Sequence, residues 1–525
     1  MVRDRHLILL VSCIFSISSV LLATSFKTAP MLACLAGVAG ANLILAAGLR
    51  RSEALARPIQ GRWLLLCVLL GLLLAALGGE GHFFFSKDDW LIRDAVLADL
   101  VSRWLPVPYA INADVSLLRA PLGMFLLPAA FGRMFGLGAA HFAQLAQSGA
   151  ILGGVFYVVT LVWPRRRLLF LGLFIAFAGV DIVPILIKTQ GEWIPRYLAF
   201  WVDGMYYPAN LSLIFWTPNH AFPGFWFAAL VALYIRREVD LAGLAAASAP
   251  LALWSPITLA GAALLFVLLA LRDLRALLTP RFALACASAA AFAPILVYLV
   301  TAADSAPHGW RIAEDGVAEI YPIFLIFSLT QAVVLALFMR RIEPEMRYPL
   351  LASTLLLALI PCYSIGYMSD FSQRGSIVPH CILAFGFNAL LIDLCETGWR
   401  SLREKALEPR IAFGAASALV IFLAASVTPA LELWDSIVTP RYAASDCNLL
   451  TSNAKLSGPK YFATYLAPAA SFPDWLIRSA EAKEPLAIEQ RSCWPDRVFG
   501  ERKFNYMKPE YLIWLRRPPE VTAQR

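Results

Sequence analysis

Charge is scarce in this sequence. Only 15% of its 525 residues are Asp, Glu, Lys or Arg, and 59% are hydrophobic, whereas a soluble domain is typically about 25% charged and about 45–50% apolar. The composition excludes an ordinary soluble domain and predicts a polytopic membrane protein. The net charge of +8 does not indicate a nucleic-acid partner, because the Arg residues lie in short loops between apolar runs, as the positive-inside rule requires.

Signature motifs of several enzyme classes are also absent. The sequence has no Gly-rich phosphate loop, no nucleophile elbow, no His-Glu-x-x-His motif and no paired CxxC motif. Soluble nucleotide-sugar chemistry and metalloprotease chemistry depend on such spacings, so both are disfavoured. We predict no cofactor and no metal site, and we leave a requirement for a divalent metal open.

The cysteines lack zinc-type and redox-type spacings. Seven of the nine lie in or beside apolar segments, and only Cys447 and Cys493 lie in the polar tail. We predict that these two form a disulfide, which requires the tail to be in an oxidising compartment. Closing a loop of roughly 45 residues would stabilise the fold by about 3–4 kcal/mol.

Thirteen apolar segments are candidates for crossing a membrane, which takes about 20 residues. The first has no small-residue cleavage site and is interpreted as a retained anchor. Two short segments flank Trp254-Ser255-Pro256, so they form either a hairpin of two helices or one bent buried helix. The segments are 6–24, 30–48, 63–79, 140–162, 168–188, 221–235, 241–253, 257–271, 282–300, 321–339, 349–366, 377–394 and 411–427.

The Lys and Arg residues between these segments predict the orientation. The basic loops all face the cytoplasm only if residues 121–136 do not cross, so we expect that segment to be a helix on the outer face. The amino terminus is then cytoplasmic. The predicted fold is an all-α polytopic membrane module, 1–427, with about thirteen transmembrane helices, outer-face surface helices in a first outer loop at 80–139, and a small extracytoplasmic C-terminal domain, 428–525, that is α/β or irregular.

Two adjacent carboxylates, Asp88 and Asp89, follow the third apolar segment, where the chain leaves the membrane. A charged side chain at the edge of the membrane needs an oppositely charged partner or has a functional role. A short helix here would pair Asp89 with Arg93 and Asp99 with Arg103, and would lay its apolar side on the membrane surface. The alternative is a solvated helix start that Asp88 or Asp89 caps.

An acid pair at such a position suits one reaction in particular. One carboxylate can accept the proton of a hydroxyl group while that hydroxyl attacks the anomeric carbon of a sugar. If the leaving group is already a phosphate, no strong general acid is needed.

Two lone basic residues, Arg196 and Arg374, lie in outer loops that otherwise carry few positive charges. Each needs an anionic partner. The partner is either a protein carboxylate, such as Asp370 for Arg374, or the phosphate of a lipid-linked substrate, which Arg binds bidentately.

Other polar residues on the same predicted side have two interpretations each. His220 begins a span and is either a capping or interface residue or a member of a pocket. Glu192 flanks an aromatic cluster that includes Tyr207, and the cluster is either the interfacial belt, which we rank first, or a surface for sugar rings or a polyprenyl chain. Asp181 lies inside a span and either pairs with a basic residue or contacts substrate.

The layout resembles that of the membrane-embedded GT-C glycosyltransferases, which use polyprenyl-phosphate sugars. The shared features are the acidic motif Lys87-Asp88-Asp89-Trp90 in a long first outer loop, a surface helix ending at Trp104-Leu105-Pro106, an aliphatic helix at 121–136 and a soluble outer tail. Three phrases are similar to those of bacterial members of this superfamily: Thr217-Pro218-Asn219-His220, Leu253-Trp254-Ser255-Pro256 and Asp370-Phe371-Ser372-Gln373-Arg374. Two features differ, because Arg119-Ala120-Pro121 replaces the usual His-Pro-Pro run and two spans are additional.

The resemblance implies inverting transfer of a sugar from a polyprenyl phosphate to a glycan, lipid or protein acceptor on the outer face of a bacterial inner membrane. It assigns the base to Asp89, with Asp88 in support. The alternatives are a transporter or flippase for a lipid-linked glycan and a non-catalytic assembly protein. The expected substrate-binding residues are Arg374, Arg196, His220, Glu192, Trp90 and Tyr207.

Overall fold

The computed structural model describes residues 2–111, 114–191, 198–202, 204–303, 307–314, 316–366, 370–404, 408–456, 462–479, 483–491 and 493. Most of these residues are helical. They form two compact units, each built from separate stretches of the chain. Unit 1 comprises Met1–Arg167, Leu213–Ala306 and Asp435–Pro495, and unit 2 comprises Leu168–Ser212, Pro307–Trp434 and Asp496–Arg525.

Unit 1 has two largely buried helices at its centre, α6 (Leu137–Val162) and α10 (Pro218–Ile235). A helix that is apolar on every side packs inside a protein. Glycines bring α3 (Gly61–Leu77) close to α6, since a Cβ on Gly71 would lie 2.7 Å from the carbonyl oxygen of Gly149. The other helices are α1 (Asp4–Ala23), α2 (Thr28–Leu49), α4 (Trp90–Arg103), α5 (Gly123–Phe135), α11 (Leu241–Ser248), α12 (Pro256–Arg272), α13 (Leu274–Leu277), α14 (Pro280–Ala290), α15 (Ala293–Val300), α22 (Leu449–Leu456) and α23 (Phe462–Tyr465).

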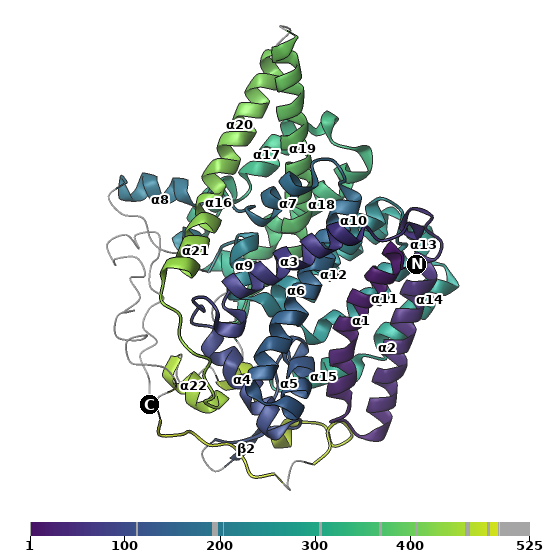
Figure 1. Ribbon diagram of the computed structural model, residues 1–525, viewed down its shortest axis with the longest axis vertical. Helices are drawn as coiled ribbons and strands as arrows, with labels where there is room; N and C mark the ends of the chain where they lie inside the picture. Colours follow the sequence, from purple (N-terminus) through teal and green to yellow (C-terminus); the bar gives the residue numbers. More distant parts are fainter. Residues whose placement is uncertain are drawn as a thin grey trace. The chain divides into compact units, whose positions relative to one another are not determined.

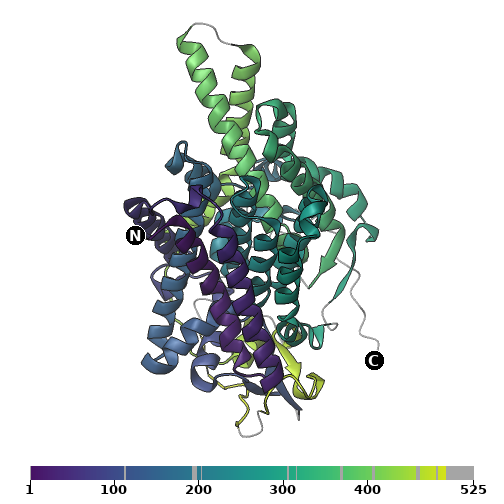
Figure 2. The same ribbon diagram turned by 90° about the vertical axis from the view of Figure 1, so that its right-hand side faces the viewer.

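Helices α1 and α2 lie side by side in both ribbon views (Figures 1 and 2), and the predicted loops sort to their opposite ends. Near the start of α1 and the end of α2, the Asp4 N–H donates to the Arg57 carbonyl at 3.1 Å, and Arg281 donates to the Ile44 carbonyl at 2.6 Å. Near the turn between the two helices, the Lys27 N–H donates to the tail carbonyl of Leu476 at 2.9 Å. Within unit 1, segments that we predict on the inner side therefore contact one another. The tail, which we predict on the outer side, contacts the turn between α1 and α2, which is also predicted to be outer.

The C-terminal tail contributes a strand to unit 1. Strands β1 (Pro108–Ile111), β2 (Asp114–Leu118) and β5 (Leu466–Pro468) form an antiparallel sheet in the order β1-β2-β5. The predicted disulfide between Cys447 and Cys493 is confirmed. The predicted boundary of a separate C-terminal domain at residue 428 stays a prediction.

Unit 2 contains α7 (Arg167–Ile175), α8 (Ile182–Thr189), α16 (Val317–Ser328), α17 (Thr330–Leu337), α18 (Pro344–Leu359), α19 (Ile377–Arg403) and α20 (Pro409–Ala425). Helices α9 (Asn210–Trp216) and α21 (Val427–Val438) each contain a boundary between the units. Strand β3 (His308–Trp310) pairs with β4 (Tyr363–Ile365), and the Ser372 hydroxyl donates to the Gly204 carbonyl at 3.3 Å. These contacts bring segments in and beside the second, third and fourth predicted outer loops together.

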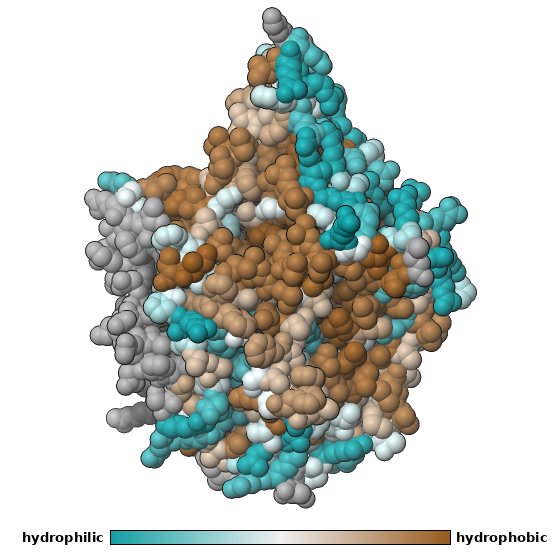
Figure 3. All heavy atoms as spheres, viewed as in Figure 1, coloured by the Kyte–Doolittle hydropathy of each residue, from teal (hydrophilic) through white to brown (hydrophobic). Residues whose placement is uncertain are grey.

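Helices α19 and α20 pack as an antiparallel pair in unit 2 (Figures 1 and 2). The surface of α20 is apolar along much of its length and polar near the turn that joins it to α19 (Figure 3). Phe413, Val420 and Leu423 are exposed along α20. Large exposed apolar side chains on a long helix are what contact with lipid favours.

The described residues contain five helices that are long and apolar enough to cross a membrane, or seven if each of two bent helix pairs is one span. This is fewer than the predicted thirteen. Several of the other predicted segments are short or broken: α3 and α12 have 17 residues each, and 168–188 divides into α7 and α8. Segment 241–271 is two helical pieces, which break at Trp254 and Ser255. Apolar composition alone does not reveal such breaks.

Candidate functional site

The first outer loop begins with a sharp turn after α3. Gly79 has φ +105°, and a Cβ there would lie 2.6 Å from Cα of Ser86. Any other residue at this position would have an unfavourable backbone conformation and a Cβ that clashes with Ser86, so glycine is required. The turn leads into the short helix η2 (Glu80–His82) and then to the start of α4 at Trp90.

The predicted ion pair between Asp89 and Arg93 is confirmed. Their side chains approach to 3.3 Å across one turn of α4, and the Asp89 side chain is 45% exposed. Arg93 is largely buried, donates to the Trp216 carbonyl and lies 5.1 Å from the centre of the Trp90 ring. Asp89 precedes the helix as its cap residue but makes no side-chain capping bond. Its carboxylate is therefore held from one side by Arg93 and is open to solvent on the other.

The neighbouring Lys87 is buried and neutralised by the tail. Its ammonium lies 2.5 Å from the carboxylate of Asp435, and both side chains are at most 6% exposed. The rings of Phe85 and Trp216 lie 5.5 and 5.4 Å from the ammonium. The tail also donates a hydrogen bond from the Tyr442 hydroxyl to the Ser86 carbonyl at 2.5 Å. These contacts fix the acidic motif to the tail.

The other residues of the motif are internal. Asp88 is buried. Trp90 is 1% exposed, and its ring nitrogen donates to the Gly78 carbonyl at 2.8 Å. Trp90 thus packs α4 against the end of α3, and its predicted contact with substrate stays a prediction. Of the two adjacent carboxylates, Asp89 is therefore the exposed one.

The expectation that the apolar side of α4 lies on the membrane surface is wrong for Leu97 and Leu100. Both are fully buried, and α4 packs against α5 and the tail helix α22. The tail therefore covers this side of α4. Burial against protein removes the same apolar area from water as burial in lipid would, so the helix does not need the membrane surface.

Two of the phrases that carry the resemblance meet in unit 1. The ring of His220 lies 2.6 Å from the Ser255 hydroxyl through Nδ1 and 3.1 Å from the Asn219 amide through Nε2. Ser255 in turn caps α12 by accepting from the Thr258 N–H at 3.1 Å. His220 is buried, so it joins two helix starts, as the interface interpretation of this residue expects.

No family model, curated protein or solved structure matches this chain. The resemblance to the GT-C superfamily therefore depends on the layout and on the motif residues alone.

Four of the predicted substrate-binding residues belong to the sequence stretches of unit 2: Arg374, Tyr207, Glu192 and Arg196. Arg374 pairs with Asp370 at 2.9 Å, which is the internal partner named above. Tyr207 is buried, donates to the Leu357 carbonyl and packs against Phe324. Glu192 and Arg196 lie outside the described residues.

Asp181 has neutral partners in unit 2. It accepts from the Trp201 ring nitrogen at 3.0 Å and from the Thr428 hydroxyl at 3.5 Å. These contacts show no basic partner for Asp181 among the described residues. They therefore do not support the interpretation that it pairs with a basic residue.

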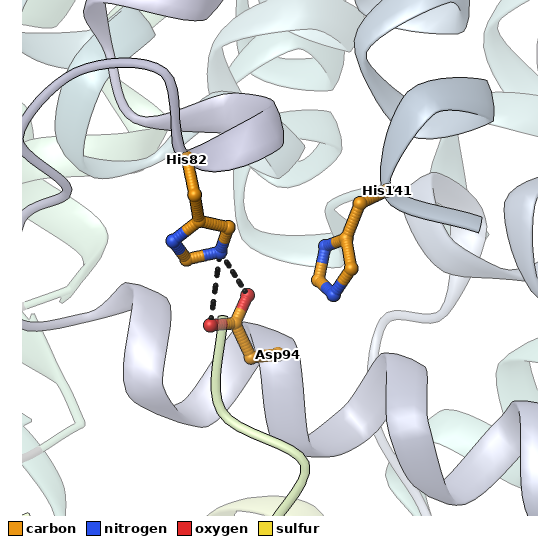
Figure 4. Close-up of side chains that lie close together, drawn as sticks. All are labelled: His82, Asp94 and His141. Carbon is orange, nitrogen blue, oxygen red and sulfur yellow. Dashed lines mark hydrogen bonds and ion pairs between the residues drawn. The ribbon is translucent and has the colours of Figure 1, made fainter. Parts of the chain in front are cut away.

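A cluster that the sequence analysis missed lies beside the acidic motif. His82 of η2, Asp94 of α4 and His141 of α6 converge in unit 1 (Figure 4), with all three side chains buried. The only hint in the sequence is that His82 lies at the start of the first outer loop, 80–139, and His141 lies two residues after its end. Nothing local to either residue indicates that Asp94 joins them.

A buried acid in the same short helix has altered electrostatics. Burial raises the pKa of Glu80 to about 8, against smaller opposing effects of Ser148 and Arg93. Glu80 is therefore largely protonated at neutral pH.

A cavity of about 620 Å³ in unit 1 lies near the opposite end of α4. Lys483, one of its lining residues, donates to the Trp104 carbonyl at 3.0 Å, just after α4 ends. A helix of 14 residues is about 21 Å long. The cavity is thus well separated from Asp89 along the helix, and it is not the site that the acidic motif forms.

Asp99 is bound to the tail and not to Arg103, so that predicted pair is wrong. Asp99 accepts from the Tyr109 hydroxyl at 2.6 Å and from the Leu449 N–H at 2.9 Å, and Arg103 lies 4.0 Å from Glu484. Two donors held at a buried site satisfy the carboxylate better than an exposed guanidinium does. Burial raises the pKa of Asp99 to about 7, against the opposing effect of Tyr109.

This pKa predicts a pH-dependent stability. Because the pKa of Asp99 is higher in the folded state than the unfolded value of about 3.9, the residue lowers stability progressively from about pH 4 to pH 7, and fully above that. Asp99→Asn keeps an acceptor for Tyr109 and Leu449 but does not ionise. We expect the melting temperature of the variant, relative to that of the natural protein, to rise between pH 5 and pH 8 in detergent. Parallel melting curves across this range would contradict the assignment.

Proposed function

We propose that this protein is a membrane glycosyltransferase that moves a sugar from a polyprenyl phosphate to an acceptor on the outer face of a bacterial inner membrane. The observation that carries the proposal is the Asp89 carboxylate, which is half exposed at the start of α4 and held by Arg93. A general base needs a positioned carboxylate that the acceptor can reach. Asp88 and Lys87 are buried beside it and support the local structure.

In the proposed reaction, the oxygen of an acceptor hydroxyl attacks the anomeric carbon of the donor sugar. The hydroxyl proton passes to a carboxylate oxygen of Asp89. The bond between the anomeric carbon and the phosphate oxygen breaks, and polyprenyl phosphate leaves with the electron pair. A single displacement inverts the configuration at the anomeric carbon.

Three observations support this proposal and its topology of about thirteen spans. Within unit 1 the predicted inner and outer loops contact separate partners, and within unit 2 segments in and beside the predicted outer loops meet one another. The disulfide between Cys447 and Cys493 is the type of bond that forms in the periplasm and not in the cytosol. The phrases at His220 and Ser255 are in contact, as parts of one structural motif would be.

A transfer assay tests the proposal. Membranes containing the protein receive a panel of polyprenyl phosphates, each with a different radiolabelled sugar, hexose or pentose. We expect at least one sugar to appear in a product that membranes with the Asp89→Asn variant do not form. If folded protein transfers no sugar from any donor, the proposal is wrong.

Arg374 is proposed to bind the donor phosphate. Arg374→Lys keeps the charge and can still pair with Asp370, but it loses the planar fork. Losing one charge-assisted hydrogen bond, typically about 1.5–3 kcal/mol, weakens donor affinity by about tenfold or more. The measurement is donor binding by the two proteins. Unchanged affinity in Arg374→Lys, with Asp370→Asn as destabilising as Arg374→Gln, would show that Arg374 only pairs with Asp370.

A further inference from the structure

The cluster of His82, Asp94 and His141 has the ligand set of a transition-metal site. Two imidazoles and one carboxylate, from three different elements of unit 1, each offer one ligand atom, and these atoms lie within 4.8 Å of one another. Figure 4 shows both rings turned toward the Asp94 carboxylate. All three side chains are at most 9% exposed, so the cluster is shielded from water by protein.

The hydrogen bonds of His82 assign its tautomer. The Ser86 hydroxyl donates its one hydrogen to the Gly79 carbonyl at 3.1 Å, so it can only accept from Nδ1 of His82, which lies 3.3 Å away. Nδ1 therefore carries a proton, and Nε2 faces Asp94. An imidazole that donates through one nitrogen to a protein oxygen presents its other nitrogen to a metal in the correct tautomer.

The distances already match part of a coordination sphere. Nε2 of His82 lies 3.2 and 3.1 Å from the two oxygens of Asp94. Two ligands on one tetrahedral zinc ion, each at about 2.0–2.1 Å, are about 3.4 Å apart. These two ligands can therefore hold an ion after small adjustments, and the third ligand atom lies within 4.8 Å of both.

The third ligand has an unmet requirement. Nε2 of His141 is buried and has no hydrogen-bond partner among the described residues, although its ring centre is 5.3 Å from that of His82. A buried polar atom without a partner is destabilising, and a bound metal ion would satisfy it. Asp94 also has an outer partner, since the Ser445 N–H donates to it at 3.2 Å, which is how ligating carboxylates are oriented.

We propose that His82, Asp94 and His141 bind one divalent transition-metal ion. Zn²⁺ is the ion expected first, because two His and one carboxylate are a frequent zinc ligand set. The ion joins η2, α4 and α6, and so fixes the helix that carries Asp89. This site is independent of the proposed glycosyl transfer, because the ion binds whether or not the protein moves a sugar.

Metal content tests the proposal directly. The full chain, purified in detergent with a tag that contains no histidine, is analysed by mass spectrometry of its metals. We expect about one equivalent of a divalent transition metal per chain. After removal of that metal, added Co²⁺ should give the visible absorption of a protein-bound ion with nitrogen and oxygen ligands.

Matched variants separate ligation from folding. His141→Cys should keep the metal because a thiolate also ligates zinc, and its Co²⁺ form should gain a sulfur-to-metal charge-transfer band. His141→Phe, which has a ring of similar size, should lose at least nine-tenths of the metal. His380→Phe replaces an equally buried histidine outside the cluster and should keep it. The proposal is overturned if the natural protein takes up neither metal nor Co²⁺, or if His141→Phe binds as much as His380→Phe.

Discussion

Asp89→Asn is expected to abolish sugar transfer without unfolding the protein. A positioned general base typically contributes about 10²–10⁴ in rate, and an amide cannot accept the hydroxyl proton. The fold should survive because Asp89 is 45% exposed and its pair with Arg93 is worth at most about 1 kcal/mol. The rate of label transfer per mole of folded protein, with the melting temperature as a check, measures both effects.

Two control variants sharpen this result. Asp446→Asn changes another exposed acid that is ion-paired, in this case with Arg491, and should transfer at the normal rate. Asp89→Glu keeps a base at a displaced position and should retain part of the activity. Near-normal turnover of Asp89→Asn, with Asp88 intact, would remove Asp89 from the role of base.

Lys87→Met is expected to be the most destabilising single change in the acidic motif. It leaves the carboxylate of Asp435 buried without its cation, and breaking a buried ion pair by removing one partner costs about 3–5 kcal/mol. The Thr439 hydroxyl, which donates to Asp435 at 2.7 Å, is neutral and does not replace the charge of the ammonium. Thermal or denaturant unfolding of the purified protein measures the loss.

The double variant Lys87→Met with Asp435→Leu provides the internal control. Removing both charges removes the uncompensated carboxylate, so most of the stability should return. Arg491→Met breaks the exposed pair with Asp446 and should cost no more than about 1 kcal/mol. If Lys87→Met is as mild as Arg491→Met, then the buried pair does not hold the motif to the tail.

Local features of this protein could be predicted because they depend on short spacings. The pair of Asp89 and Arg93 follows from a four-residue spacing on a helix. The disulfide follows from the fact that the tail contains two cysteines. The breaks near Gly79 and at Trp254–Ser255 coincide with turn residues in the sequence, glycine at the first and Pro256 at the second.

Features that depend on distant residues could not be predicted. Lys87 and Asp435 are 348 residues apart, and either could have paired elsewhere. Asp99 could have reached Arg103 by spacing, but tertiary packing gives it Tyr109 and Leu449 instead. His82 and His141 approach Asp94 only because α3 packs closely on α6.

The described residues contain fewer long apolar helices than the thirteen predicted spans, for a related reason. Hydropathy counts apolar residues, and it does not distinguish a helix in lipid from a helix buried in protein. Helix α10, for example, is almost completely buried within unit 1. The break between α7 and α8, at 176–181, falls within an apolar stretch that reads as one span.

The most direct test of the account reconstitutes the purified protein in liposomes that carry a labelled polyprenyl-phosphate sugar and an acceptor. Two quantities are measured in the same sample: sugar transferred to the acceptor, and donor moved between the leaflets. The account predicts that sugar is transferred with release of an equal amount of polyprenyl phosphate, and that Asp89→Asn stops transfer. Movement of intact donor between leaflets without any transfer would contradict it and would identify a flippase.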